Sequence, residues 1–337
     1  MTAQRPLLPV ALTMGEPAGI GGEITLKAWG QHTEMTTPFF VIGDAGHLQR
    51  LAGDLGLKIQ VTAIDHAAEA ADVFNTALPV LNQPLASPSL AGKLNTDNGA
   101  AVMGWIEKAA GLAQAGKVSA VVTNPIHKKC LYDAGFTFPG HTEYLAALSG
   151  IKTPPVMMLA SPKLRVVPVT IHVGLTAAIA ALSTELIVTI ATITAGALKT
   201  DFGIKAPRLA IAGLNPHAGE GGAMGAEEAA IITPAIAALL ARGIDATGPW
   251  PPDTLFHDAA RQGYDAAICM YHDQALIPIK TLDFDGAVNV TLGLPFVRTS
   301  PDHGTALDIA GTGKASAASL LAALEMASNM AKQRGCT

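Results

Sequence analysis

The chain alternates short apolar, β-branched runs with longer Ala-rich stretches, and this alternation limits its possible folds more than any other feature. Each apolar run ends at a turn of Gly, Asn, Pro or His, and a helical stretch follows. Strands alternating with helices at this spacing predict a parallel or mixed sheet with helices on both faces. The clearest predicted strands are Leu7–Met14, Phe39–Ile42, Ser119–Val122, Leu164–Ile171, Arg208–Ala212 and Tyr264–Met270.

Two further segments complete this pattern. The stretch Leu78–Asn98 is rich in proline and predicts a surface excursion rather than a regular element. The last helix is expected over about Lys314 to Arg334. Its buried face should carry Leu320, Leu321, Leu324 and Met326.

Composition excludes several classes of protein. Of the 337 residues, 49% are hydrophobic and only 15% are charged, which excludes intrinsic disorder and allows about two domains. The net charge of −5 and the lack of a basic stripe argue against nucleic acid as a partner. Three cysteines without a pairing pattern favour a reducing compartment, and we expect a cytoplasmic protein.

One apolar segment is long enough to span a membrane and has to be tested. Glu185 is the only charged residue between Val173 and Leu198. However, Ser183 is followed by Thr184 and Glu185 in the middle of this run, a pattern typical of a helix N-terminus. The run therefore divides into two shorter amphipathic helices, and we expect no membrane span.

Four of the predicted strands are followed by a histidine, either at once or within a few residues. These residues are His127, His172, His217 and His272. Ligands of open α/β sheets bind outside the carboxyl ends of the strands, so these imidazoles should reach one edge. Converging neutral imidazoles suit zinc or a similar divalent ion. A single histidine in this position would more commonly be a helix cap, and only the set of four indicates a metal.

Two glycine-containing turns could bind an anion. Gly140 precedes His141, Thr142 and a helical run, which predicts free backbone N–H groups and a hydroxyl at a helix start. An ordinary N-cap by Thr142 explains this spacing equally well. The segment from Met14 to Glu23 also follows a strand and opens a helix, but it is neither a GxGxxG fingerprint nor a P-loop.

Two cations stand among apolar neighbours in a chain that has only 22 Lys and Arg residues. Lys280 and Arg298 in such surroundings indicate recognition of a carboxylate or phosphate, with Arg298 suited to bidentate contact. A structural salt bridge is the competing interpretation for either residue.

Seven sequence motifs, taken together, resemble those of a known family. They read MGEPAGIGGE, VVTNPIHK, FPGHTEYLA, VTIHV, GLNPHAGEGGAMGAEE, YHDQALIPIK and VNVTLGLPFVRTSPDHGTALDIAGTG. Together they resemble the 4-hydroxythreonine-4-phosphate dehydrogenase family of pyridoxal phosphate biosynthesis, from about Leu7 to Ser316. That family is similar in turn to the metal-dependent β-decarboxylating dehydrogenases.

The resemblance implies a fold and an assembly. The expected α/β fold has two α/β/α lobes with mixed sheets and an active-site cleft between them, as in isocitrate and isopropylmalate dehydrogenases. We expect residues 1–130 with 305–337 to form the first lobe and residues 131–304 the second. The family resemblance also implies a homodimer with the active site at the subunit interface.

The resemblance also implies roles for particular residues. A divalent metal ion (zinc, magnesium or cobalt) would be held by His172, His217 and His272, which leaves His127 outside the metal site. Lys280 or Asp273 would act as the catalytic base, and the residues alone do not decide between them. The expected substrate-binding residues are His141, Thr142, Lys280, Asn289, Arg298 and Asp253.

The nicotinamide cofactor would bind the loop 304–311 and not a Rossmann turn. Its expected binding residues are His303, Gly304 and Asp308. By analogy with the related dehydrogenases, Asp308 would contact the adenosine ribose hydroxyls. An acid at this position disfavours a 2′-phosphate, which favours NAD over NADP, although the family accepts both.

The expected reaction is NAD(P)-dependent oxidation of 4-phosphooxy-L-threonine, followed by loss of CO₂, in vitamin B6 biosynthesis. The nearest alternative is a family relative that oxidises another four-carbon phosphorylated acid, such as 4-phospho-D-threonate or 4-phospho-D-erythronate. Another alternative is a histidine-zinc lyase or hydrolase of sugar phosphates. The loop HGTALDIAG argues against it, because such an enzyme needs no nicotinamide cofactor. A non-catalytic metal or phosphate binding protein would leave Lys280 and Asp273 unexplained.

Overall fold

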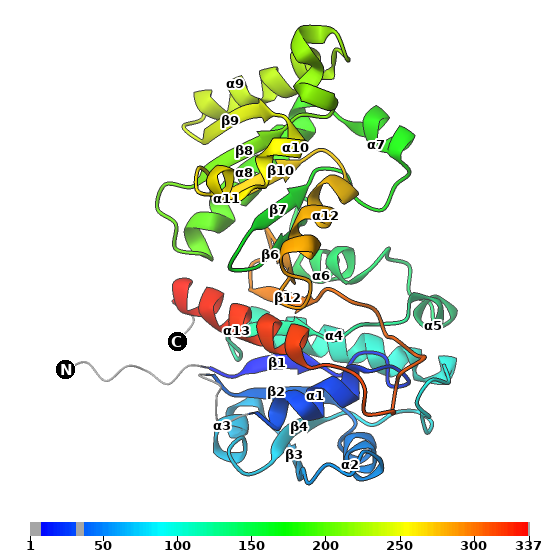
Figure 1. Ribbon diagram of the computed structural model, residues 1–337. Coiled ribbons are helices and arrows are strands. Elements are labelled where there is room, and N and C mark those ends of the chain that lie inside the picture. The colour runs from blue at the N-terminus through cyan, green and yellow to red at the C-terminus, as the bar shows by residue number, and fades with distance from the viewer. Residues whose placement is uncertain (1–7, 32–36, 336–337) are drawn as a thin grey trace, which may run out of the picture. The chain divides into compact units, whose positions relative to one another are not determined.

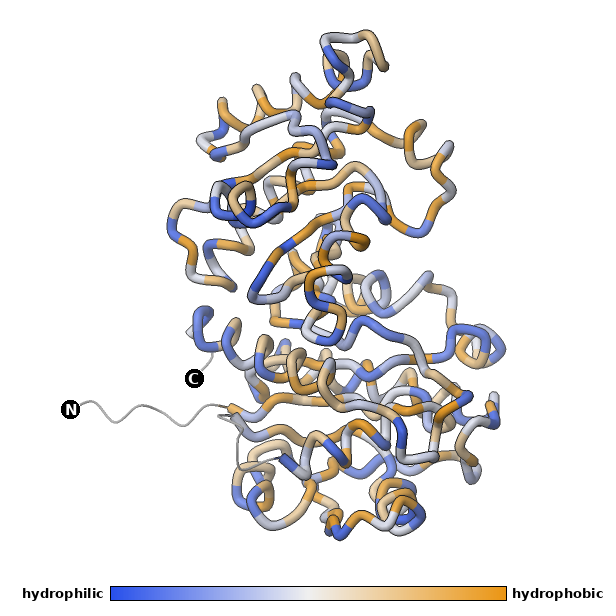
Figure 2. Tube along the Cα trace, in the orientation of Figure 1, coloured by the Kyte–Doolittle hydropathy of each residue, from blue (hydrophilic) through white to orange (hydrophobic). Residues whose placement is uncertain are grey.

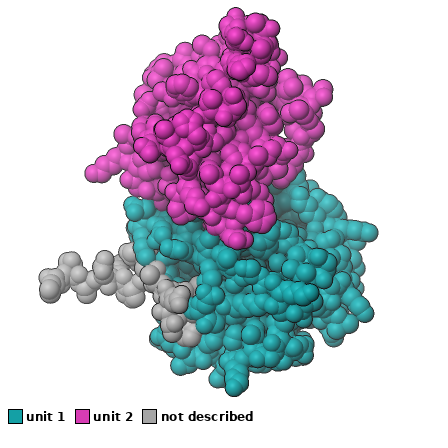
Figure 3. Space-filling model, in the orientation of Figure 1, with its two compact units in different colours: residues 1–155, 294–337 teal, residues 156–293 magenta. Residues whose placement is uncertain are grey.

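The computed structural model describes residues 8–31 and 37–335, and the chain divides into two compact units. The first unit comprises Met1–Pro155 and Leu294–Thr337, and the second comprises Val156–Gly293 (Figure 3). Strands and helices alternate along the chain, which confirms the predicted α/β fold class.

The unit boundaries differ from the expected lobe edges, because residues 131–155 and 294–304 lie in the first unit. Two observations explain the difference. Strand β12 (Arg298–Pro301) pairs in parallel with β5 (Ala120–Thr123). Helix α6 (His141–Ser149) packs on α4 (Gly99–Gln114), where the Tyr144 hydroxyl donates a 2.5 Å hydrogen bond to Glu107.

The strands of the first unit follow the order β3-β4-β2-β1-β5-β12 and pair in parallel (Figure 1). Parallel strands place all their carboxyl ends at one edge, where loops can build a site. In addition to β5 and β12, the strands are β1 (Val10–Thr13), β2 (Phe39–Gly43), β3 (Val61–Ile64) and β4 (Leu78–Asn82). Leu7, the start of the first predicted strand, lies outside the described residues.

Helices of the first unit pack in two groups. Helix α1 packs against α2 and α13, whereas α4 packs on β1, β2 and β5 and against α5 and α6. The elements not yet given are α1 (Gly21–Trp29), α2 (Ala45–Asp54), η2 (Ala67–Glu69), α3 (Ala70–Val73), η3 (Thr96–Asn98), α5 (Lys128–Asp133) and α13 (Ala318–Gln333). In α13, Leu320 and Leu324 are buried as predicted, whereas Leu321 and Met326 are only partly buried.

The prediction for the segment 78–98 was wrong at its start. Leu78–Asn82 forms β4, an almost fully buried strand between β2 and β3. Pro79 lacks an N–H donor and is uncommon inside a sheet, which makes the sequence read as a loop. The buried side chains of Leu78, Val80 and Leu81 nevertheless hold the strand in place.

The strands of the second unit follow the order β11-β6-β7-β10-β8-β9. Strand β6 pairs antiparallel with β11 and β7, while β7, β10, β8 and β9 are parallel neighbours. Their bounds are β6 (Val156–Ala160), β7 (Arg165–Pro168), β8 (Arg208–Ala212), β9 (Asp245–Trp250), β10 (Ala266–Cys269) and β11 (Val288–Leu292).

The helices of the second unit pack on this sheet. Helix α12 packs on β6, β7 and β10, and α8 packs on β6, β8 and β11. The helical segments are α7 (Leu175–Ala181), α8 (Thr184–Thr200), η4 (Pro216–Gly222), η5 (Glu228–Ile232), α9 (Thr233–Ala241), α10 (Pro252–Leu255), α11 (Asp258–Arg261) and α12 (His272–Leu282).

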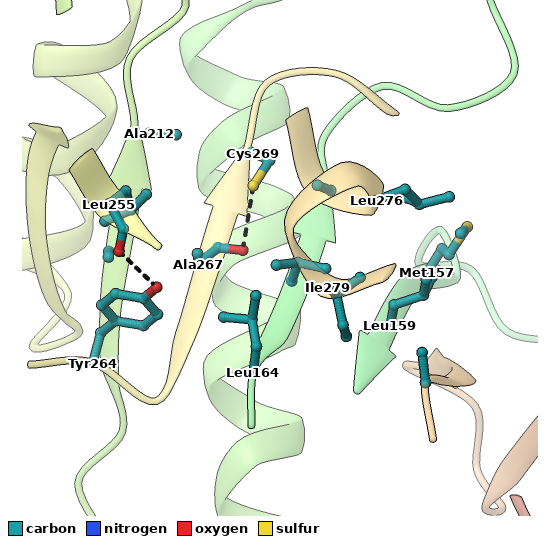
Figure 4. Close-up of a cluster of buried hydrophobic side chains, with 14 residues drawn as sticks. Met157, Leu159, Leu164, Ala212, Leu255, Tyr264, Ala267, Cys269, Leu276 and Ile279 are labelled. Atoms are coloured by element: carbon teal, nitrogen blue, oxygen red, sulfur yellow. Dashed lines mark hydrogen bonds between the residues drawn. The ribbon is translucent and has the colours of Figure 1, made fainter. Parts of the chain in front are cut away.

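Aliphatic and sulfur-containing side chains fill the core of the second unit between α12 and the sheet. Leu159, Val166 and Ile279 are fully buried there, and the Tyr264 hydroxyl donates a 3.0 Å hydrogen bond to the Leu255 carbonyl (Figure 4). Figure 2 shows the hydropathy of each residue along the same trace. Cys130 and Cys269 are both free and buried, and burial raises the pKa of each thiol.

The apolar run from Val173 to Leu198 divides into two helices, as predicted. The Ser183 side chain caps α8 by accepting a 3.1 Å hydrogen bond from the Leu186 N–H. Helices α7 and α8 meet at 90°. Within the described residues no single helix is long and apolar enough to cross a membrane, although this bent pair reaches the required length and composition together.

Candidate functional site

Three of the four predicted histidines follow neighbouring strands of the second unit. His172 follows β7, His272 begins α12 just after β10, and His217 follows β8. These strands are parallel and adjacent in the order β7-β10-β8, so all three loops leave the same edge of the sheet. His127 follows β5, a strand of the first unit.

His172 and His272 form a close pair. Their ring centroids lie 5.7 Å apart, with the ring planes inclined by 45°. His272 Nδ1 lies 2.7 Å from the Asp273 carboxylate, which leaves Nε2 of the neutral ring as the nitrogen able to bind a metal. The two rings line a pocket of about 270 Å³ together with Thr170, Tyr271 and Asp273.

His217 lies in a turn that two acidic residues organise. Glu228 Oε1 accepts hydrogen bonds from the N–H groups of Leu214 (2.8 Å) and Asn215 (2.7 Å). The Asn215 side-chain amide donates to Glu228 Oε2 (2.9 Å) and to Glu227 (2.8 Å). Burial by itself would raise the pKa of Glu228, but the hydrogen bonds from Asn215 and Leu214 outweigh it and lower the pKa.

Sequence reasoning missed this role of Glu228. Glu228 lies eleven positions after His217, and no known sequence spacing connects the two residues. Only the pair Glu227–Glu228 at the end of the motif GLNPHAGEGGAMGAEE marks the position in the sequence.

Backbone strain is concentrated in these loops and in the predicted cofactor loop. The non-glycine residues with positive φ, within the described ranges, are His172 (49°), His217 (53°), Ala218 (51°), Glu220 (41°) and Ala306 (42°). Each such backbone conformation raises the free energy of the folded state by about 1–3 kcal/mol, and such residues cluster at functional sites. Two of the three predicted metal ligands are among them, which supports a functional role for both loops.

The described residues contain no group of three His, Cys, Asp or Glu side chains close enough to hold a metal ion. The chemistry of the close pair still fits a divalent ion, because His172 and His272 are nitrogen donors and a carboxylate orients His272. The predicted third ligand, His217, is not gathered with them, so the complete trio stays a prediction.

Lys280 lies on α12 beside the histidine pair. Its Nζ lies 5.6 Å from the centre of the Phe284 ring, and it lines a second pocket of about 430 Å³ with His272, Asp273 and Leu276. Asn289 lies in β11, paired with Leu159. Asp253 is exposed on α10. The structure places Lys280 and Asp273 in one pocket with His272, whereas Asn289 and Asp253 line neither of these two pockets.

The first unit holds a cationic site at the start of α6. Arg298 at the start of β12 is 3% exposed and donates a 2.6 Å hydrogen bond to the Thr123 hydroxyl. Burial lowers the Arg298 pKa to about 10, partly offset by Glu143. Gly140 is the N-cap of α6 and no side chain caps this helix, so interpreting Thr142 as the cap was wrong. The predicted anion-binding turn therefore has its backbone N–H groups uncapped.

His141 is the first residue of α6. The residue is partly exposed, but its ring Nε2 is inaccessible and has no hydrogen-bond partner among the described residues. Burial, followed by the charges of Arg298 and Lys128, holds the His141 pKa well below its usual range. A neutral imidazole and a buried guanidinium beside a helix N-terminus are the groups that bind a phosphate or carboxylate.

The predicted cofactor loop follows β12 in the first unit. His303, Gly304 and Asp308 are exposed, and His303 Nδ1 lies 3.0 Å from the Gly304 carbonyl oxygen. The loop contains no regular helix or strand between Pro301 and Ala318. Exposed polar groups on an irregular loop at the carboxyl edge suit the binding of a ligand.

The turn from Met14 to Glu23 does not present its glycines to a ligand. A Cβ on Gly15 would lie 2.5 Å from the Pro125 carbonyl oxygen, and one on Gly21 would lie 2.5 Å from that of Met14. A Cβ on Gly19 would lie 2.9 Å from the Thr305 carbonyl oxygen. These glycines therefore permit close packing of the chain on itself, and the predicted approach of a phosphate to this turn is not supported.

The fold and these sites define a mixed α/β protein with histidines along one sheet edge and a cationic site at a helix start. The family model of the pyridoxal phosphate biosynthetic protein PdxA matches residues 34–327. The chain belongs to this family.

Relatives support the assignment over nearly the whole chain. The chain is 54% identical over 335 residues to the 4-hydroxythreonine-4-phosphate dehydrogenase of Bradyrhizobium diazoefficiens, covering 96% of this chain and 97% of the relative. It is 53% identical over 332 residues to the enzyme of that name from Caulobacter vibrioides, covering 97% and 98%. The crystal structure of 4-hydroxythreonine-4-phosphate dehydrogenase from Klebsiella pneumoniae superposes with a TM-score of 0.87 at 40% identity, covering 96% and 99%.

Proposed function

We propose that the protein is a 4-hydroxythreonine-4-phosphate dehydrogenase that oxidises the C3 hydroxyl of 4-phosphooxy-L-threonine with NAD. The product, 2-amino-3-oxo-4-phosphooxybutanoate, is a β-keto acid that loses CO₂ to give 3-amino-2-oxopropyl phosphate. This reaction would serve pyridoxal 5′-phosphate biosynthesis. Membership of the PdxA family and the names of its relatives support the proposal.

The observation that carries the proposal is the site of Arg298 and His141. A buried guanidinium and the uncapped start of α6 suit a phosphorylated, anionic substrate. The neutral His141 ring can accept or donate one hydrogen bond without adding charge. Thr142, Lys280, Asn289 and Asp253 would complete the substrate contacts.

His172, His217 and His272 would hold one divalent metal ion (zinc, magnesium or cobalt). When bound, such an ion acts as a Lewis acid toward the hydroxyl and carbonyl oxygens of a substrate. The contribution of this chain is orientation: Asp273 fixes the tautomer of His272, and Glu228 holds the turn that carries His217.

We assign the base to Lys280, with Asp273 as the alternative. The Asp273 carboxylate already accepts a hydrogen bond from His272, which favours an orienting role for it. Lys280 Nζ lies on the same helix two turns further on and lines the same pocket as His272. A base must reach the C3 hydroxyl proton, and a side-chain amine beside His272 is a suitable type of base.

NAD would bind the loop that carries His303, Gly304 and Asp308, and when bound it accepts a hydride from C3. The exposed Asp308 carboxylate would accept hydrogen bonds from the adenosine ribose and disfavour a 2′-phosphate. NADP is then the weaker cofactor.

Apolar side chains beside the histidine pair support a homodimer. Val173, Leu175 and Ile179 on and before α7 are 53%, 57% and 40% exposed, and Ile277 and Phe284 are 64% and 73% exposed. Exposed apolar groups that gather near a functional site are typical of interaction surfaces. We propose a cytoplasmic homodimer whose two-lobe fold resembles the isocitrate dehydrogenases, with its active site at the subunit interface.

Substrate profiling tests the function. Purified protein is incubated with NAD and 4-phosphooxy-L-threonine, 4-phospho-D-threonate or 4-phospho-D-erythronate, and NADH formation is followed. The proposal predicts the highest kcat/KM for 4-phosphooxy-L-threonine. A higher value for either threonate-type acid would assign the protein to another substrate, and no NADH with any of them would remove the dehydrogenase activity.

A further inference from the structure

The turn after β1 and the loop after β12 meet at one edge of the first unit. Strands β1 and β12 both pair in parallel with β5, so their carboxyl ends lie at the same edge, on either side of the end of β5. The Ile20 N–H donates a 3.0 Å hydrogen bond to the Thr305 carbonyl oxygen. A loop carbonyl thus occupies an N–H at the start of α1, where a ligand phosphate could otherwise bind.

Lys27 of α1 fixes the other end of the same loop. Its Nζ donates to the carbonyl oxygens of Gly313 (2.7 Å) and Ala315 (2.6 Å) and to Glu23 Oε1 (2.9 Å). An ammonium group has three donors, so this geometry uses all of them. The Lys27 side chain is 25% exposed.

Glu23 of α1 contacts both Lys27 and the loop residue Ala315. Its side chain is fully buried, and Oε1 also accepts a 3.0 Å hydrogen bond from the Ala315 N–H. A buried carboxylate is costly unless it is paired, and here the pair holds both polar groups of one loop residue. The two residues are one helical turn apart on α1, which is why they reach the loop together.

Glycines allow the close approach that this arrangement needs. Gly19 packs against Thr305, as described above, and a Cβ on Gly311 would lie 2.7 Å from the Ala91 Cβ. Gly311 also has a φ of 70°, which favours glycine. The loop between Thr305 and Ala315 is therefore held at both ends and packed at its middle, although it has no regular secondary structure.

We propose that Lys27 and Glu23, with Gly19, are positioning residues that hold the loop 304–313 in the conformation that binds the dinucleotide. This inference rests on the proposed function, because it takes the loop as the cofactor site. None of the three residues needs to touch the cofactor. Their role is to remove conformational freedom from the loop before binding, which lowers the entropic cost of binding.

The test uses two pairs of matched variants of the full-length protein. Lys27→Met removes the three hydrogen bonds, and Arg208→Met removes an ion pair with Asp265 (3.1 Å) in the second unit. Gly19→Ala introduces a methyl group against Thr305, and Gly53→Ala introduces one in α2, where nothing lies within 4 Å. Glu23→Gln keeps an acceptor for Ala315 and provides a milder variant in case Lys27→Met does not fold.

Hydrogen exchange followed by mass spectrometry reports on the loop without cofactor or activity. Lys27→Met and Gly19→Ala should speed exchange in the peptides covering residues 303–315, whereas Arg208→Met and Gly53→Ala should not. In steady-state assays the first two variants should raise the KM for NAD about tenfold or more. The KM for the phosphorylated substrate and kcat at saturating NAD should stay within about threefold. Lys27→Arg should recover part of the loss.

Unchanged loop exchange and an unchanged NAD KM in both Lys27→Met and Gly19→Ala would overturn the inference. An equal rise in the KM for both ligands, together with a fall in kcat, would also overturn the inference, because it would show a general structural role. Failure of the proposed function looks different, since the wild-type protein would then neither bind NAD in calorimetry nor form NADH.

Discussion

The His172 and His272 rings lie with their centroids 5.7 Å apart, each just beyond the carboxyl end of one of two adjacent parallel strands. His172 holds a left-handed backbone with φ of 49°, and His272 is oriented by Asp273. Backbone strain is common at functional sites, and a carboxylate that orients a histidine is common in metal sites.

Replacing His272 by Ala should remove bound metal. Loss of one nitrogen donor weakens a three-histidine site by several orders of magnitude, so purified His272→Ala should contain less than about a tenth of the wild-type metal. Inductively coupled plasma mass spectrometry of dialysed protein measures this. His257→Ala, at the start of α11, serves as the matched control and should keep its metal. Equal metal content in both variants would contradict the assignment.

Arg298→Lys should weaken substrate binding. Lysine keeps the positive charge but lacks the planar guanidinium, which donates to Thr123 and has further N–H groups that would contact a substrate oxyanion. We expect kcat/KM for the phosphorylated substrate to fall by about a hundredfold or more, from the loss of charge-assisted hydrogen bonds. The KM for NAD should stay nearly constant. A lysine variant with wild-type kcat/KM would remove Arg298 from the substrate site.

Glu228→Gln should destabilise the turn that carries His217. The carboxylate accepts three hydrogen bonds from Leu214 and Asn215, and their loss or weakening should cost about 2 kcal/mol in the free energy of unfolding. Urea unfolding measures this. Because the folded-state pKa of Glu228 is lowered, its contribution is present above the unfolded pKa and is lost as pH falls through the folded pKa. The Gln variant should therefore lose less stability on acidification than the wild type does.

His141 should make stability depend on pH near neutrality. Its folded-state pKa is held well below the usual value of 6.5, so the unfolded chain binds more protons over this range. The free energy of unfolding should therefore be highest above pH 6.5 and fall as pH decreases below it. His141→Gln should show a shallower fall. Parallel curves for both proteins, measured by urea unfolding between pH 8 and pH 5, would contradict a buried neutral imidazole.

Asp308→Ala should raise the KM for NAD far more than the KM for the phosphorylated substrate. The exposed carboxylate would otherwise accept the ribose hydrogen bonds, which are worth about 1.5–3 kcal/mol when one partner is charged. That range corresponds to a rise of roughly ten- to a hundredfold in KM. The ratio of NADP to NAD activity should rise in the same variant. An unchanged NAD KM would remove Asp308 from the cofactor site.

Local patterns predicted the strands well and the contacts between distant loops poorly. The six predicted strands all form, because each is a mostly buried apolar run followed by a turn. Strand β4 was missed, since Pro79 interrupts a pattern that burial completes. The hydrogen bond from Lys27 to Gly313 joins residues that are 286 positions apart in the sequence. It follows from the parallel strand order β1-β5-β12, which no local sequence pattern encodes.

The candidate site was predictable to a similar degree. Strand ends located His172, His217 and His272 after neighbouring strands of the second unit, whereas only the family resemblance set His127 apart from them. The unit boundaries and the role of Glu228 depended on pairings between segments far apart in the chain. Such pairings are set by packing of whole elements, so a single sequence read by its spacing does not reveal them.

The most direct test of the central claim is formation of NADH from NAD and 4-phosphooxy-L-threonine, before and after removal of metal. We expect NADH formation with release of CO₂, loss of NADH formation on treatment with EDTA, and its return on addition of Zn²⁺, Co²⁺ or Mg²⁺. Full activity after complete removal of metal, or no NADH with metal and NAD in excess, would contradict it.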